Sequence, residues 1–124
     1  MFVSNSDNAP KRQRPGLTSR ILLQAEDTSG AALAVTWVDV EPGGAQAPHQ
    51  HDPQQVYVII SGTGRMQVGD EQRELRPGDL VFIPPRVMHG IDNTGDQPLT
   101  YVSAATPAFK ISDTYDDGQL AWAI

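Results

Sequence analysis

The chain has 124 residues, which is enough for one domain with a single hydrophobic core and too few for two. It contains no cysteine, which excludes disulfides, thiolate metal sites and thiol nucleophiles, and its net charge of -6 disfavours a nucleic-acid surface because phosphate binding needs clustered positive charge. No apolar run approaches the ~20 residues of a membrane helix, and residues 1–16 lack the apolar core of a signal peptide. We therefore expect a cytoplasmic protein that binds neither nucleic acid nor a membrane.

Residues 1–16 are rich in Ser, Asn, Pro and Arg, with too little apolar surface to offset the entropy lost on ordering. This composition predicts a flexible N-terminal arm. Lys11, Arg12 and Arg14 form a small basic cluster in it. We favour a solvated tail, and the alternative is a contact with a partner or an acidic neighbouring subunit.

From Leu17 onward, short extended runs alternate with turn residues, and no stretch before the tail keeps a helical period. Gly69-Asp70 predicts a tight hairpin turn after a strand whose Met66 and Val68 share one face. Closely spaced strands with Gly and Pro turns are typical of an antiparallel sandwich or barrel, so we predict an all-β fold. The predicted strands are residues 20–25, 32–40, 56–61, 64–68, 71–75, 80–83 and 99–104.

The C-terminal segment, residues 106–124, is predicted to be a partly irregular tail within the domain formed by residues 17–124. Its apolar residues are interspersed with three aspartates, and we expect them to pack on the outside of the β-structure or on a neighbouring subunit. Exposed sheet edges also need cover. Together these features predict a homodimer.

The three histidines of the chain fall in two segments that are suited to a metal site. His49 and His51 are two residues apart, so on an extended strand both imidazoles would lie on the same face, close enough to share one ion. His89 follows the turn-forming pair Pro84-Pro85 in a second such segment. Neutral imidazole suits Fe, Mn, Ni, Co, Cu or Zn, and with no cysteine present the remaining ligands must be oxygen.

Both segments resemble the signature motifs of the cupin superfamily. The first runs from Gly43 to Gly62 and contains His49, His51 and Gln55; the second runs from Gly78 to Asn93 and contains Pro84 and His89. The resemblance implies a small, single-domain, conserved cupin barrel of jelly-roll type. It also implies one divalent metal ion, held by His49, His51, Gln55 and His89.

Two positions depart from the family pattern. Gln55 stands where the family usually has glutamate, and Arg86 stands where the second motif usually has glycine. Gln54 is an alternative ligand if Pro53 bulges the strand. We prefer Gln55 because it keeps the count to Gly62 and shares a strand face with Tyr57, the best candidate for a pocket residue.

A site of three imidazoles and one amide oxygen is one unit more positive than a site with a carboxylate. This strengthens Lewis acidity and disfavours oxidation of the metal, so it favours non-redox chemistry. A six-coordinate ion would keep two positions open for substrate oxygens or for water.

We therefore predict a metal-dependent lyase or isomerase that acts on a small oxygen-rich molecule such as a sugar acid, an enol or a diol. Similar small cupins that handle unsaturated sugar acids carry three histidines and a glutamine. Tyr57 or Tyr101 would relay a proton. Arg86 would either orient a substrate carboxylate or remain a solvated loop residue. The alternatives are a metal-dependent dioxygenase and a cupin that binds a small molecule without turnover.

Overall fold

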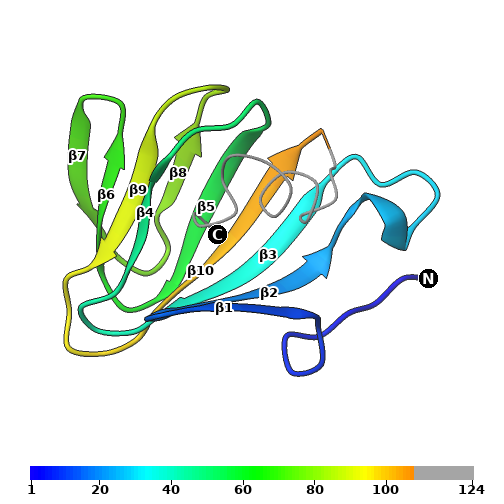
Figure 1. Ribbon diagram of the computed structural model, residues 1–124, viewed down its shortest axis with the longest axis horizontal. Coiled ribbons are helices and arrows are strands. Elements are labelled where there is room, and N and C mark those ends of the chain that lie inside the picture. Colours follow the sequence, from blue (N-terminus) through cyan, green and yellow to red (C-terminus); the bar gives the residue numbers. More distant parts are fainter. Residues whose placement is uncertain (108–124) are drawn as a thin grey trace.

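The computed structural model describes residues 1–107, and this part of the chain is almost entirely β-structure (Figure 1). The single helix among these residues is the short 3-10 helix η1 (Ala25–Asp27). The strands are β1 (Lys11–Arg14), β2 (Leu17–Leu23), β3 (Ala34–Val40), β4 (Ala45–His49), β5 (Gln54–Ser61), β6 (Gly64–Val68), β7 (Glu71–Leu75), β8 (Leu80–Ile83), β9 (His89–Asn93) and β10 (Leu99–Thr106).

The strands form two facing antiparallel sheets of jelly-roll type, as Figure 1 shows, which confirms the predicted all-β fold. The six-stranded sheet has the order β1-β2-β3-β10-β5-β8, and the four-stranded sheet has the order β4-β9-β6-β7. Neither sheet is closed by hydrogen bonds. Strands that are distant in the sequence, such as β5 and β10, therefore lie side by side and can bring distant residues to one site.

Three predicted strands, residues 64–68, 71–75 and 80–83, coincide with β6, β7 and β8. The predicted hairpin also forms: Val68 pairs with Glu71, and Gly69 has a φ of 56°. A positive φ at the first of two loop residues is the geometry of a type II′ turn, which glycine adopts without steric cost. Alternating polarity and turn chemistry were sufficient signals here.

Residues 11–14 differ from the expected arm, because they form β1. The strand pairs with β2 over four residue pairs, from Lys11 with Arg20 to Arg14 with Leu17, and the Ile21 N–H donates to the Pro10 carbonyl at 2.8 Å. Backbone hydrogen bonds of this kind need no apolar side chains. A polar composition therefore concealed the strand.

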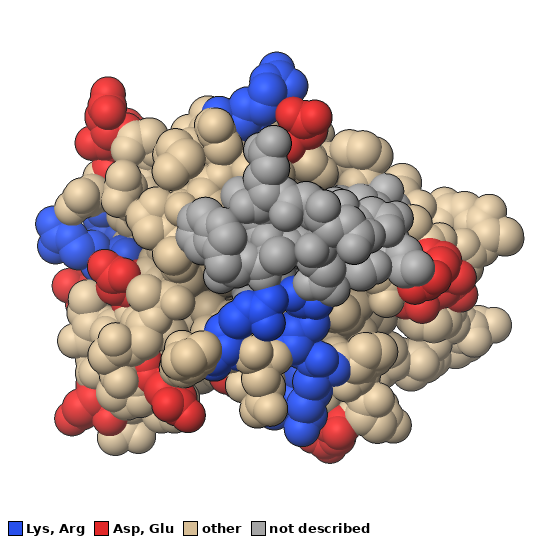
Figure 2. All heavy atoms as spheres, viewed as in Figure 1, with Lys and Arg blue, Asp and Glu red and all other residues tan. Residues whose placement is uncertain are grey.

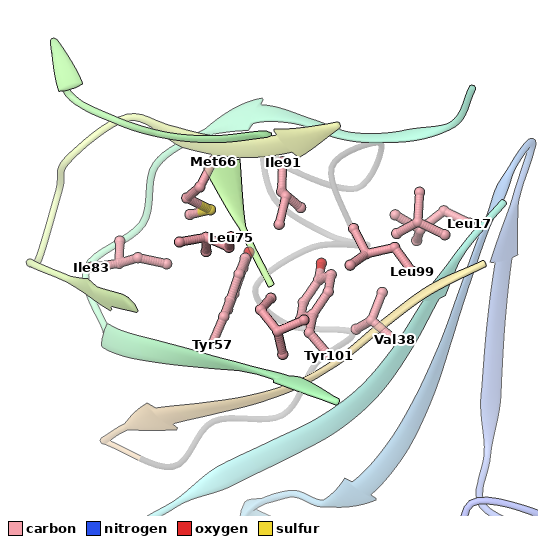
Figure 3. Close-up of a cluster of buried hydrophobic side chains, with 11 residues drawn as sticks. Leu17, Val38, Tyr57, Met66, Leu75, Ile83, Ile91, Leu99 and Tyr101 are labelled. Atoms are coloured by element: carbon pink, nitrogen blue, oxygen red, sulfur yellow. The ribbon is translucent and has the colours of Figure 1, made fainter. Parts of the chain in front are cut away.

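The hydrophobic core lies between the two sheets (Figure 3). Tyr57 and Tyr101 project into it from the six-stranded sheet, and their rings are stacked with centroids 4.3 Å apart, whereas Met66 and Ile91 approach from the opposite sheet. The buried members of the cluster are Leu17, Val38, Val40, Tyr57, Ile59, Met66, Leu75, Ile83, Ile91, Leu99 and Tyr101.

Asn93 ends β9 and closes the loop that follows it. Its amide nitrogen donates to the carbonyls of Val40 and Gln97 at 2.9 and 2.8 Å, and its side-chain oxygen accepts from the Gly95 N–H at 2.9 Å. Three hydrogen bonds from one buried side chain fix both ends of the loop. This residue of the second motif therefore has a structural role.

Charged side chains are dispersed over the face shown in Figure 2. Asp and Glu form several separate groups, and one larger group of Lys and Arg lies toward the bottom of the view, the side on which Figure 1 places β1. Within residues 1–107, no helix has the length and apolar character needed to cross a membrane. The predicted packing of the C-terminal segment falls largely on residues 108–124, which lie outside the described residues.

Candidate metal centre

The three histidines meet at one end of the interior. His49 is the last residue of β4 and pairs across the sheet with His89, the first residue of β9. One nitrogen from each of the three rings lies within 4.8 Å of the others, and all three residues are buried. The convergence expected from the sequence is therefore present.

His51 reaches the cluster by a different route from the one predicted. We expected His49 and His51 on one strand, but β4 ends at His49 and His51 lies in the following turn. The His51 carbonyl accepts the Arg86 N–H at 2.8 Å, which ties this turn to the loop between β8 and β9. The link between the two motif loops, and not strand alternation, places the second imidazole.

Each imidazole is oriented by a backbone carbonyl two residues away. The Nδ1 atoms of His49, His51 and His89 lie 2.8, 2.9 and 2.9 Å from the carbonyl oxygens of Ala47, Pro53 and Val87. A carbonyl only accepts, so each Nδ1 carries the proton and the lone pair of each neutral ring is on Nε2. This arrangement of a backbone acceptor behind the ring is the one usually found behind metal-bound histidines.

The Nε2 atom of His89 gives the clearest evidence that a ligand binds between the three imidazoles. It is buried, the residue is 0% exposed, and no hydrogen-bond partner for this atom exists among the described residues. A buried acceptor without a partner costs free energy comparable to a lost hydrogen bond. A metal ion bound to this lone pair would remove that cost, so the residues present fit a metal centre.

Gln55 supplies an oxygen to the same cluster. Its side chain is buried, and its Oε1 lies 3.0 Å from His51 Nε2. Both atoms are acceptors when His51 donates from Nδ1, so their contact is unfavourable unless a cation binds them both. Neighbouring ligands at right angles, with metal bonds of ~2.1 Å, are ~3.0 Å apart, which fits this spacing.

The structure distinguishes between the two glutamines. The Gln54 side chain is exposed and donates to the Thr106 hydroxyl at 3.2 Å, on the other face of β5. Gln55 points inward and its Nε2 donates to the hydroxyl of Ser103. Gln55 is therefore the amide placed with the histidines, in agreement with the count of residues to Gly62.

Burial keeps the imidazoles neutral. Removal from water, together with the nearby His89, lowers the pKa of His49 to about 3. Burial likewise lowers the pKa of His89 to about 4, and it lowers the pKa of His51 below 6.5. Because only the neutral ring offers a lone pair, the cluster is ready to bind a metal ion at neutral pH.

A small cavity of about 20 Å³ adjoins the cluster. The ring centroids of Tyr57 and His89 are 6.2 Å apart, and Tyr57 stacks on Tyr101. Burial, the nearby Tyr101 and a hydrogen bond with it raise the pKa of Tyr57 well above 10, so its hydroxyl stays protonated. The cavity is lined by Thr36, Val38, Gln46, His49, Gln55, Tyr57, Tyr101 and Ser103.

Thr36, Gln46 and Ser103 were not identified from the sequence. Ser103 shares a strand face with Tyr101, and Thr36 pairs with Ser103 across β3 and β10. Ser103 could have been predicted, because it is two residues from Tyr101 on the same strand. Thr36 could not, because nothing in the sequence indicates that β3 lies beside β10. Gln46 lies in β4, a strand that was not predicted.

Arg86 lies in the loop between β8 and β9, and the environments of its backbone and its side chain differ. Its φ is 59°, in the region that glycine favours, which explains why the family pattern usually has glycine there. The side chain is 73% exposed and its guanidinium lies 3.8 Å from the Asp52 carboxylate, outside the set of cavity-lining residues. Its role toward a substrate stays a prediction.

Gly90 permits the two histidine strands to pack closely. A Cβ atom on this residue would lie 2.9 Å from the Gln46 carbonyl oxygen and 3.0 Å from the Pro48 nitrogen, both backbone atoms of β4. The register of β4 against β9 shifts between Gln46 and His49, which restores the pairing of His49 with His89. Glycine beside His89 therefore lets this irregular pairing form.

The family model described as "Cupin domain" matches residues 36–105, which include all four residues of the candidate metal centre. The chain belongs to the cupin family. A protein from Methanocaldococcus jannaschii, described as uncharacterised, is 29% identical to this cupin over 106 residues, which are 85% of each chain. The structure of KdgF from Halomonas sp. matches 86% of this chain and 94% of its own with a TM-score of 0.73 and 24% identity, a likeness of fold.

Two relatives of named activity match only part of their own length. H2HPP isomerase of Bacillus subtilis is 35% identical over 69 residues, which are 55% of this cupin and 28% of the isomerase. A 5-nitrosalicylic acid 1,2-dioxygenase of Bradyrhizobium sp. is 33% identical over 64 residues, 51% of this cupin and 31% of the dioxygenase. The relatives thus include both non-redox and oxygen-using enzymes.

Proposed function

We propose that this cupin is a metal-dependent lyase or isomerase for a small oxygen-rich molecule, such as a sugar acid or an enol. The observation that carries the proposal is the convergent set of ligand atoms. It consists of three neutral imidazoles, each oriented by a backbone carbonyl, and the Gln55 amide oxygen, which faces the unprotonated Nε2 of His51. His49, His51, Gln55 and His89 would hold one divalent ion. The ion would act as a Lewis acid and stabilise negative charge on a substrate oxygen.

The other residues of the site would act on protons and on orientation. Tyr57, whose raised pKa keeps it protonated, would donate a hydrogen bond or a proton to the substrate, and Tyr101 would support it through the hydrogen bond that they share. Arg86 would reach a substrate carboxylate from the loop between β8 and β9. We also propose that the protein is a cytoplasmic homodimer whose partner is this small molecule.

The choice of a non-redox reaction rests on the neutral fourth ligand. An amide in place of a carboxylate raises the net charge of the site by one unit, which favours the divalent over the trivalent ion. The similarity to H2HPP isomerase supports this choice, although it covers only part of that protein.

Metal loading tests the centre. Purified protein is to be stripped with chelator, dialysed against Mn, Fe, Co, Ni, Cu or Zn, and its metal content measured by elemental analysis beside the His51→Ala variant. We expect about one ion per chain in the parent and none retained in the variant, whose circular dichroism should remain that of a β protein. Equal metal content in both proteins would contradict the proposed site.

Turnover tests the reaction class. The loaded protein is to be incubated anaerobically with unsaturated sugar acids and enol-forming keto acids, and the loss of their ultraviolet absorbance followed. We expect conversion that disappears in the Tyr57→Phe variant or falls at least tenfold. Tight binding of these compounds with no product would instead support a cupin that binds a ligand without turnover.

A dioxygenase is the second candidate, and the similarity to 5-nitrosalicylic acid 1,2-dioxygenase favours it. The same donor set would accommodate Fe or Mn with open positions for substrate and dioxygen. Oxygen consumption by the Fe-loaded or Mn-loaded protein with catechol-like or salicylate-like substrates, measured with an oxygen electrode, would replace the lyase or isomerase proposal with this one.

A further inference from the structure

The hydroxyl of Ser103 accepts a hydrogen bond from the side-chain amide of Gln55. We propose that Ser103 is a positioning residue, which orients this amide so that its oxygen, and not its nitrogen, faces the metal site. The inference rests on the proposed metal centre. It assigns a function to a residue that neither the motifs nor the spacing of the histidines includes.

The contact is built into the larger sheet. On β5 and β10, Ser103 pairs with Tyr57 and Ala105 pairs with Gln55, so Ser103 and Gln55 are diagonal neighbours on adjacent strands. Both side chains are buried in the interior face. Burial weakens the competition from solvent for this hydrogen bond, and the strand register brings its two side chains together.

The orientation matters because the two ends of an amide are different. The oxygen has lone pairs for a cation, whereas the NH₂ group is a donor and repels one. With Gln55 Nε2 directed to Ser103, Gln55 Oε1 lies 3.0 Å from His51 Nε2. Without a metal, a flipped amide would accept from the Ser103 hydroxyl and donate to His51, which removes the oxygen ligand. With an ion bound to Oε1, the amide nitrogen faces away from the ion and needs an acceptor, which the Ser103 hydroxyl supplies.

A carboxylate at residue 55 would not need this help, because its two oxygens are equivalent. The glutamate that usually stands there in the family can bind a metal with either oxygen. The glutamine of this chain can bind a metal with Oε1 alone, and its amide nitrogen then needs an acceptor, which the Ser103 hydroxyl supplies. We therefore expect Ser103 to affect metal binding when residue 55 is glutamine, and to affect it little when residue 55 is glutamate.

The test is a double-mutant cycle on metal affinity. Ser103→Ala, Gln55→Glu and the double variant are to be prepared without metal, and the dissociation constant for Mn²⁺ and for Zn²⁺ measured by isothermal titration calorimetry or by competition with a chelating dye. We expect Ser103→Ala to weaken binding at least tenfold when residue 55 is glutamine, as losses behind a metal ligand do. We expect it to weaken binding no more than threefold when residue 55 is glutamate.

Ser19→Ala is the matched control, since Ser19 is also a buried serine of the same sheet, but on β2, which is not adjacent to β5. Its metal affinity should stay within threefold of the parent, and circular dichroism should confirm that each variant is folded. Equal losses from Ser103→Ala in the parent background and in the Gln55→Glu background would overturn the role of Ser103 while leaving the metal centre intact. A parent protein that binds neither metal would overturn both proposals.

Discussion

The interior of this cupin has two parts that are built from the same strands. β5 contributes Ile59 to the apolar core and Gln55 to the histidine cluster, and β9 contributes Ile91 to the core and His89 to the cluster. The core residues gain free energy simply by leaving water. The cluster residues lose hydration on burial, and in the part of the chain that the structure describes the Nε2 atom of His89 gains no hydrogen-bond partner in return.

This difference separates structural stability from function. The buried polar groups of a binding site lower the free energy of unfolding, and the burial of the surrounding apolar core offsets this loss. Substitutions in the core should therefore change stability without changing metal affinity, whereas substitutions in the cluster should change metal affinity and the response of stability to acid. The following experiments test this separation, from the largest expected effect to the smallest.

Acid should unfold the metal-free protein, and the cluster should be the cause. The pKa values of His49 and His89 are lowered to about 3 and about 4, so between pH 6.5 and those values the unfolded chain binds more protons than the folded one. The free energy of unfolding is then highest above pH 6.5 and falls as the pH decreases. Urea unfolding followed by circular dichroism at a series of pH values measures it.

The pH range from 6.5 to about 5 is the informative one. Carboxyl groups have ordinary pKa values of about 4, so above about pH 5 their titration changes the free energy of unfolding little. In a variant that carries both His49→Gln and His89→Gln, the stability should change much less over this window. A parent protein whose unfolding free energy is constant from pH 7 to about 5 would contradict the assignment of neutral buried imidazoles.

Ile59→Ala should damage the core without damaging the site. Ile59 is 1% exposed, and truncation of such a side chain costs about 2–5 kcal/mol in unfolding free energy. Its neighbour Ile60 is 44% exposed, so Ile60→Ala is a matched control that should cost less than about 1 kcal/mol. Denaturant unfolding measures stability, and calorimetry should give a metal affinity within threefold of the parent. A tenfold loss of affinity in Ile59→Ala would show that the two parts are not separable.

Gly90→Ala should affect both parts at once, because Gly90 lies where β4 and β9 pack. The added Cβ meets backbone atoms of Gln46 and Pro48, which cannot rotate away, so we expect a loss of about 1–3 kcal/mol and weaker metal binding. Gly30, whose Cβ would meet nothing within 4 Å, provides the control Gly30→Ala. Thermal unfolding with and without Zn²⁺ measures both effects. Equal stability of the two variants would contradict the close approach of the strands.

Arg86→Gly should stabilise the protein slightly. Its φ of 59° costs an ordinary residue about 1 kcal/mol relative to glycine, while the Arg86 N–H to His51 bond is retained. Arg76→Gly, at an exposed residue without positive φ, should instead be neutral or destabilising. Denaturant midpoints measure the difference. A destabilised Arg86→Gly variant would mean that the guanidinium contributes more than its backbone costs.

Much of the fold could be predicted because its signals are local. β6 alternates polar and apolar residues, β8 is a short apolar run, and turns at glycine or proline bound β6, β7 and β8; each of the three strands was placed correctly. β4 and β9 could not be recognised, since their histidines, Pro48 and Gly90 are not typical strand residues and their pairing joins segments that are distant in the sequence. The two strands that carry His49 and His89 were thus the ones that local patterns concealed.

The candidate metal site also has features with a local sequence signal and features that depend on the folded chain. The motif spacing indicated His49, His51, His89 and Gln55, but it could not assign the proton of each ring or the partner of the amide. Those depend on hydrogen bonds made by the folded chain, and one of them joins residues 48 positions apart in the sequence. The exposed position of the Arg86 side chain likewise depends on how its loop folds.

The amino-acid sequence by itself determined an all-β domain, the family to which it belongs and the four side chains suited to a metal ion, because turn chemistry, alternation and motif spacing are properties of neighbouring residues. The tertiary structure alone decided that Gln55 and not Gln54 faces the histidines, that the lone pair of each neutral ring is on Nε2 and that Ser103 accepts a hydrogen bond from the Gln55 amide. These features arise from strand pairing and burial, which bring together residues that the linear chain keeps apart.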